Sequence, residues 1–228
     1  MTRRTARFAV ALLLILPVSI SAQTRAGTKS VSSKKSAAAK PVAAPPLRFN
    51  LGATGNEARY RVRELLAAST IENDAVGSTT SLTGALQIDA TGKADTTISR
   101  WVVDLTTLKS DRAMRDRFLQ HNALEIARFP KAELVVTSIK GLPVTLPASG
   151  TLTLTLLGNF TTHGVTKATS WDVVANVAGD HISGTATTHL KFAEYNMTQP
   201  RLPVVASVDD DIKLEYDFHL IRENSAKP

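Results

Sequence analysis

The sequence has no cysteine in its 228 residues. This excludes disulfides, thiol nucleophiles and cysteine metal ligands, and also a lipid anchor attached to a cysteine at the cleavage site. Aromatic residues are scarce, with 2 Trp, 3 Tyr and 7 Phe, too few for the aromatic girdles of an outer-membrane barrel. No apolar run reaches the roughly 20 residues of a membrane-spanning helix. We therefore expect the mature chain to be soluble.

Motifs that carry chemistry are also missing from the sequence. It contains no Gly-x-Ser-x-Gly elbow, no glycine-rich phosphate loop and no dinucleotide fingerprint. The run Asp209–Asp211 lacks the spaced oxygen ligands of a calcium loop. We predict no enzyme, no catalytic residue, no metal and no cofactor. No metal-ligand spacing with nearby carboxylates is found among the histidines, which are His121, His163, His181, His189 and His219.

The excess of positive over negative charge is confined to the N-terminal part of the chain. The formal net charge is +7, but residues 1–46 contain eight Lys or Arg and no Asp or Glu. The remaining chain is close to neutral and does not interleave basic with aromatic residues, so nucleic acid is an unfavourable partner.

The first 46 residues form two predicted segments that lie outside the folded domain. Residues 1–22 combine a basic start, an apolar run and small residues near Ala22, which predicts a signal peptide. Residues 23–46 are rich in Ala, Lys, Ser and Pro, which predicts a disordered linker. This linker is either a solvated spacer or a weak contact to an anionic envelope surface. The domain is predicted to cover residues 47–224.

Alternation of polar and apolar residues dominates the domain. In EARYRVREL, Ala58, Tyr60 and Val62 fall on one side of a strand and the charged residues on the other. The same period recurs in about eight segments joined by Gly, Asn and Asp corners typical of antiparallel hairpins. The predicted strands are 57–66, 79–89, 96–105, 132–140, 150–160, 166–178, 181–192 and 209–222.

Long sequential antiparallel strands favour a closed barrel over a β-sandwich, because closure removes unpaired edges. One segment, residues 110–130, breaks the alternation and predicts a short helix capped by Ser110, between the third and fourth strands. A helix there would either plug one end of the barrel or gate a ligand. Within it, Arg115 and Asp116 are expected to pair locally, with contact to a ligand as the alternative.

Three stretches in order resemble the YceI-like family: WVVDLTTLKSDRAMRDRFL, ARFPKAELVVTSI and LGNFTTHGVTKATSWDVV. The resemblance covers about residues 48–222. It implies an all-β, eight-stranded, lipocalin-like antiparallel barrel, exported to the bacterial periplasm or secreted, that holds a long isoprenoid or related amphiphilic lipid and catalyses no reaction. It is compatible with a homodimer. In this fold His163 becomes a partly exposed corner residue between two strands, with a polar contact to a ligand head group as the alternative.

We predict that the inward apolar side chains form a lumen for one extended prenyl or acyl chain. For each residue, plain core packing is the alternative, and a non-catalytic envelope interaction or stress protein with a filled barrel is the alternative for the whole chain. A lipid hydrolase would require a nucleophile and a base in the channel. The predicted ligand contacts are Tyr60, Trp101, Phe118, Leu119, Phe129, Leu154, Trp171, Phe192 and Met197.

Overall fold

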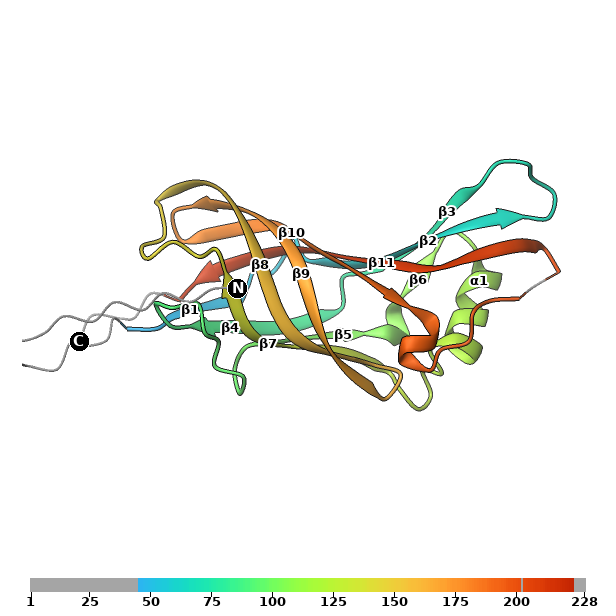
Figure 1. The fold of residues 1–228 in the computed structure, drawn as a ribbon, viewed down its shortest axis with the longest axis horizontal. Helices are drawn as coiled ribbons and strands as arrows, with labels where there is room; N and C mark the ends of the chain where they lie inside the picture. The colour runs from blue at the N-terminus through green and yellow to red at the C-terminus, as the bar shows by residue number, and fades with distance from the viewer. Residues whose placement is uncertain (1–44, 202, 224–228) are drawn as a thin grey trace, which may run out of the picture. The chain divides into compact units, whose positions relative to one another are not determined.

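The computed structural model describes residues 45–201 and 203–223, whose ribbon is shown in Figure 1. The predicted signal peptide, residues 1–22, and the predicted linker up to residue 44 lie outside the described residues. Within the described part of the chain, no helix is both long and apolar enough to cross a membrane.

Strands account for most of the described residues. The strands are β1 (Leu47–Leu51), β2 (Glu57–Leu66), β3 (Asn73–Thr79), β4 (Leu82–Ile88), β5 (Arg100–Asp104), β6 (Lys109–Ser110), β7 (Lys131–Lys140), β8 (Ser149–Thr162), β9 (Val165–Ala178), β10 (His181–Lys191) and β11 (Val205–Arg222). The helical pieces are short. They are η1 (Leu105–Thr107), α1 (Ala113–Phe118), the π-helical turn η2 (Leu119–Ala123) and η3 (Phe192–Tyr195).

Eight of the strands close into a ring of antiparallel pairs. The order is β1-β4-β5-β7-β8-β9-β10-β11, and β11 pairs again with β1 to complete the circle. The long strands β8 and β9 cross the middle of the domain in Figure 1. Closure of the ring satisfies the backbone groups that an open sheet would leave at its two edges.

The remaining strands, β2, β3 and β6, extend the sheet beyond this ring. β11 pairs first with β2, through Asp217 opposite Glu57, and then with β1, through Leu220 opposite Leu51. β1 and β2 therefore lie end to end along β11. Asn56 bridges the interruption between them: its amide donates to Gly52 O at 2.8 Å and accepts from the backbone N–H of His219 at 2.9 Å.

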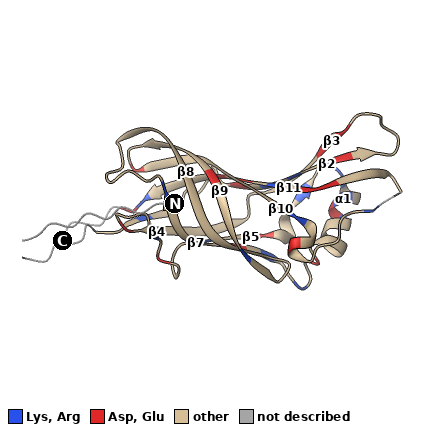
Figure 2. Ribbon diagram, viewed as in Figure 1, with Lys and Arg blue, Asp and Glu red and all other residues tan. Residues whose placement is uncertain are grey.

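Alternation of side chains separates the inside of the ring from its outside. Along β9, residues Trp171, Val173, Ala175 and Val177 are buried and their neighbours are exposed. The buried residues of the other ring strands join them in one apolar core. The outer faces carry charge, which is concentrated along β2, β3 and β11 (Figure 2).

The strand prediction succeeded where alternation was long and missed three short segments. The observed bounds lie within two residues of the predicted ones for β2, β7, β8, β9 and β10, and also for the end of β11. β11 begins at Val205 rather than at residue 209. β1, β3 and β6 were not predicted as strands. β3 has the sequence NDAVGST, whose polar residues and glycine are unfavourable in strands.

Helix α1 begins later than the sequence suggested. The predicted cap, Ser110, belongs to β6, and the N-cap position is occupied by Arg112, whose side chain makes no capping hydrogen bond. The helix lies in the connection between β6 and β7, at the same end of the closed sheet as the β2–β3 hairpin and η3 (Figure 1).

Candidate functional site

A cavity of about 510 Å³ opens inside the ring at the end where α1 lies. We call it the main cavity. Its wall is built from the inward faces of β2, β5, β7 and β11 and from one side of α1, including Ala113 and Met114. Because α1 lines the space without filling it, the helix does not plug this end of the ring.

Seven of the nine predicted contact residues line this cavity. They are Tyr60, Trp101, Phe118, Leu119, Trp171, Phe192 and Met197. They come from six different elements and from the loop after η3, so only the closed sheet brings them together. Small side chains between them, such as Ala58, Ala75 and Ala132, leave the interior open.

The other two predicted contacts lie elsewhere. Leu154 lines a second, small cavity of about 70 Å³ toward the opposite end of the ring. Phe129 lines neither cavity. Its ring packs edge-on against the imidazole of His163, with ring centroids 4.8 Å apart, and also closely approaches Gly164.

Glycines opposite two aromatic residues give those side chains room. Gly77 lies opposite Tyr60 in the β2–β3 ladder, and a Cβ atom at residue 77 would come within 2.3 Å of the Tyr60 ring. Gly84 lies opposite Trp101, where a Cβ atom would come within 2.3 Å of the indole. Any larger residue at either glycine would displace an aromatic side chain of the cavity wall.

Burial affects the ionisation of the tyrosines in this wall. It raises the pKa of Tyr60 and of Tyr216, so both phenols stay neutral across the physiological range. The two tyrosines therefore add no charge to the interior surface of the main cavity.

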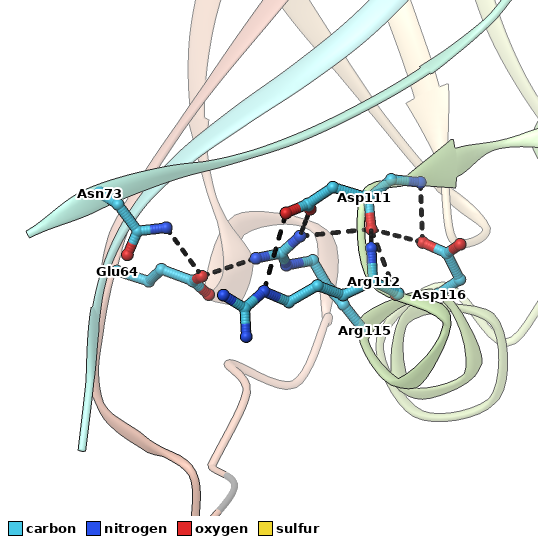
Figure 3. Close-up of polar contacts among 7 residues, drawn as sticks. Glu64, Asn73, Asp111, Arg112, Arg115 and Asp116 are labelled. Atoms are coloured by element: carbon cyan, nitrogen blue, oxygen red, sulfur yellow. Dashed lines mark hydrogen bonds and ion pairs between the residues drawn. The ribbon is translucent and has the colours of Figure 1, made fainter. Parts of the chain in front are cut away.

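A polar cluster lies at the rim, between β2 and α1 (Figure 3). Glu64 is the inward residue after Val62 on β2, and its side chain is only 6% exposed. Its Oε1 accepts from Arg115 Nη2 at 2.6 Å and from Asn73 Nδ2 at 3.3 Å. Arg115 also donates to Asp111. These bonds fasten α1 to the edge of the sheet.

Opposite charges lie in contact within this cluster. Burial opposes the charged form of Arg115, yet hydrogen bonds to Glu64 and Asp111 raise the pKa of Arg115 above its usual value. The hydrogen bond from Arg115 in turn lowers the pKa of Asp111. Arg115 and Asp111 thus each stabilise the charged form of the other.

Asp116, a residue of α1, links the helix to Ser110, which precedes it in the chain. Its Oδ1 accepts from Ser110 N at 2.8 Å and from Ser110 Oγ at 2.6 Å. Both residues thus make local contacts, as expected: Asp116 bonds Ser110, and Arg115 bonds Asp111. Arg115 in addition reaches across to Glu64, a contact between residues 51 positions apart in the chain.

His163 occupies the β8–β9 corner, as expected, in the left-handed region with φ of 48°. The residue is partly exposed, as expected, although only 9% of its side chain is exposed. Nδ1 lies 3.0 Å from Tyr195 O, and Nε2 lies 3.2 Å from Glu125 Oε1. His163 ties this corner to η3 and to the loop after η2, outside the main cavity.

Glu64 was not among the residues predicted for the site, although the alternation of β2 indicates its direction. Ala58, Tyr60, Val62 and Glu64 follow one another at a spacing of two, so the alternation places the carboxylate on the inward face. A carboxylate on an otherwise apolar face needs a partner, and Arg115 on the predicted helix was a candidate.

Elsewhere in the described residues, no three His, Asp or Glu side chains gather in a way that could hold a metal ion. Of the two cavities described above, the larger, with its polar rim, is the candidate site.

Comparison with protein families identifies the chain. Residues 49–220 match the YceI-like domain. The chain belongs to the YceI-like family. The match begins within β1 and ends within β11, so it includes every strand of the ring. A comparison with curated protein sequences finds no relative.

Solved structures share this fold at low sequence identity. A polyisoprenoid binding domain from Saccharophagus degradans, implicated in plant cell wall breakdown, aligns with a TM-score of 0.58 and 12% identity, over 78% of this chain and 99% of that one. BcnA of Burkholderia cenocepacia aligns with a TM-score of 0.52 and 13% identity, over 72% and 95%. A YceI protein of Campylobacter jejuni aligns with a TM-score of 0.51 and 13% identity, over 65% and 85%.

Proposed function

We propose that this protein is a non-catalytic binding protein whose closed ring works as a lipocalin-like barrel, holding the tail of an isoprenoid or related amphiphilic lipid in its lumen. The observation that carries the proposal is the apolar cavity of about 510 Å³ inside the ring. Family membership supports a lipid ligand, as does the likeness in fold to a structure described as a polyisoprenoid binding domain.

The size and chemistry of the main cavity suit such a ligand. Pockets for small molecules typically measure about 300–1,000 Å³ and bury most of the ligand. Burying apolar surface contributes roughly 25 cal/mol per Å², so a hydrocarbon tail gains affinity without directional contacts. The polar cluster around Glu64 and Arg115 lies where the head group of a bound lipid would emerge.

An open cavity favours this proposal over the filled-barrel alternative, in which bulky side chains occupy the whole lumen. The two alternatives differ in one measurable property, which is uptake of a lipid by the delipidated protein. A hydrolase differs again, because it would turn a prenyl ester over with a pH-dependent rate.

Intrinsic fluorescence provides the test. The sequence has only two tryptophans, and both Trp101 and Trp171 line the main cavity. Titration of the delipidated protein with a prenyl alcohol should therefore change tryptophan emission in a saturable way. Neutral alcohols are suitable probes because the polar side chains at the rim are already paired with one another.

Two neighbouring residues on β3 give a blocking variant and its matched control. Ala75 is buried and lines the cavity, whereas Val76 is the next residue and points to the outer face. We expect Ala75→Phe to weaken binding by roughly tenfold or more by filling the lumen, and Val76→Phe to leave it unchanged. Equal binding by both variants, or no binding by the wild type, would contradict the proposal.

We also propose that the protein acts in the bacterial periplasm or after secretion, on the basis of the signal peptide expected in residues 1–22. Cell fractionation with N-terminal sequencing of the mature chain tests this. Full-length protein recovered from the cytoplasm with residues 1–22 retained would overturn it.

A further inference from the structure

The interior of the ring is divided along its axis. The main cavity of about 510 Å³ lies at the α1 end, and the small cavity of about 70 Å³ lies farther along. Among the described residues, three side chains line both spaces: Trp101 on β5, Leu134 on β7 and Tyr216 on β11. They stand where one cavity ends and the other begins.

Along each of the three strands, the lining of the main cavity ends at this layer. On β11, Leu214 lines the main cavity, Tyr216 lines both and Phe218 lines only the small one. On β7, Ala132 lines the main cavity and Leu134 lines both. Since inward residues of a strand follow one another at a spacing of two, these residues form successive layers along the axis.

The dividing layer is closed by direct contact across the lumen. Trp101 and Tyr216 come from strands that are separated in the ring by β1 and β4, yet their ring centroids lie 5.9 Å apart. Leu134 is the register partner of Trp101 on the neighbouring strand. All three side chains are buried, with 6%, 7% and 9% of Trp101, Leu134 and Tyr216 exposed.

The backbone around this layer keeps the indole in place. Gly84 lies opposite Trp101, and a Cβ atom there would also come within 2.6 Å of Arg100 O. The indole is therefore held against bare backbone on one side and against Tyr216 on the other. A side chain packed in this way does not swing aside at low cost.

We propose that Trp101, Leu134 and Tyr216 form a partition that sets the length of hydrocarbon chain this protein can bury. This inference rests on the proposed function and specifies its ligand. A dry cavity of about 150 Å³ accommodates benzene, or about 25 Å³ per carbon. On that scale the main cavity of about 510 Å³ holds about twenty carbons, or about four isoprene units.

The space beyond the partition is too small to extend this length. At about 70 Å³ it corresponds to about three carbons, which is less than one isoprene unit. A longer lipid must therefore leave its additional isoprene units outside the cavity, where they add little to the affinity of the lipid for the protein. Removal of the indole would join the two spaces and admit about one to two further isoprene units.

The test is a length series of prenyl alcohols, with about three to eight isoprene units, titrated into the delipidated full-length protein. For the wild type, affinity should rise by roughly tenfold per unit up to about four units and then level off. Trp101→Ala should move this plateau to about five or six units. The remaining tryptophan, Trp171, reports binding in that variant.

Trp171→Ala is the matched control, because Trp171 lines only the main cavity. It removes an indole of the same volume but leaves the dividing layer in place, so the plateau should move less than in Trp101→Ala. Ala132→Leu acts in the opposite direction. It fills the layer next to the partition and should shorten the plateau to about three units.

These outcomes separate the inference from the function on which it rests. If no prenyl alcohol binds the wild type, the lipid-binding proposal itself fails. If alcohols bind but affinity keeps rising beyond about five units in the wild type, the partition is refuted. An equal shift of the plateau in Trp101→Ala and Trp171→Ala also refutes it, since total volume would then set the length. Should Trp101→Ala fail to fold, the wild-type plateau and the Ala132→Leu shift decide.

Discussion

Glu64 and Arg115 line the main cavity and form an ion pair at its rim. The side chains are 6% and 12% exposed, and they meet at 2.6 Å on the rim. Desolvation of two charges offsets much of their attraction, so the net stability of such a pair is modest. Removal of one partner is different, because the other charge then stays buried without its main counter-ion.

We predict that Glu64→Leu lowers the free energy of unfolding by about 2–3 kcal/mol, because Arg115 keeps only Asp111 as an ionic partner. The double variant Glu64→Leu with Arg115→Leu should recover part of this loss. Urea denaturation of the single and double variants measures both values. A single variant as stable as the wild type would show that the pair does not hold α1 to β2.

At the scale of single residues, the sequence predicted the direction of side chains on long strands but not their depth along the axis. Tyr60 and Trp171 could be assigned to the interior because their strands alternate over ten residues or more. Phe129 lies in a loop, where no period fixes its direction, and it packs against His163. The partition was not predicted because Trp101 and Tyr216 come from strands that only ring closure brings together.

Helix α1 is the element whose stability depends most on its side-chain anchors. It has six residues, none of them buried, and no side-chain cap at its N-terminus. Isolated helices of this length are unstable in water. Its position therefore depends on Asp116 with Ser110 and on Arg115 with Glu64.

We predict that Asp116→Ala loosens α1 without changing the cavity wall, because Asp116 bonds Ser110 and does not line the main cavity. The global stability should fall by only about 1 kcal/mol, while uptake and release of a bound lipid both become faster. Hydrogen exchange of residues 113–119 and stopped-flow lipid exchange measure these effects. Unchanged exchange in both experiments would mean that α1 does not control access.

The strands β2 and β11 are joined by a network of ion pairs on the outer face. Arg59 pairs with Asp217 at 2.6 Å and with Glu57 at 2.7 Å. The hydrogen bond from Arg59 lowers the pKa of Asp217, and Thr185 also donates to this carboxylate. A lowered pKa in the folded state means that the stabilisation is present above the unfolded pKa, near 4, and disappears as the pH falls.

We predict that Asp217→Asn is less stable than the wild type at pH 7 and that this difference shrinks as the pH falls below about 4. Thermal unfolding of both proteins from neutral pH to about pH 2 tests this. A difference that stays constant or grows on acidification would show that the Arg59–Asp217 pair does not contribute in the folded state.

On the scale of the whole molecule, ring closure creates the cavity. The number of ring strands could be anticipated because long alternating segments favour antiparallel hairpins, although the predicted eight included β2 in place of β1. The register could not, since β1 and β2 share one partner strand and are interrupted by residues 52–56. The same interruption explains why β1 was not recognised as a strand. It extends only from Leu47 to Leu51 and is stabilised by its two neighbours rather than by its own alternation.

The most direct test of the account is native mass spectrometry of the mature protein, purified without detergent from cells that produce it and followed by organic extraction. We expect one bound lipid per chain, which extraction removes and addition of a prenyl alcohol replaces. A chain that carries no lipid when isolated, and takes up none after extraction, would contradict the claim that the main cavity of about 510 Å³ is a binding site.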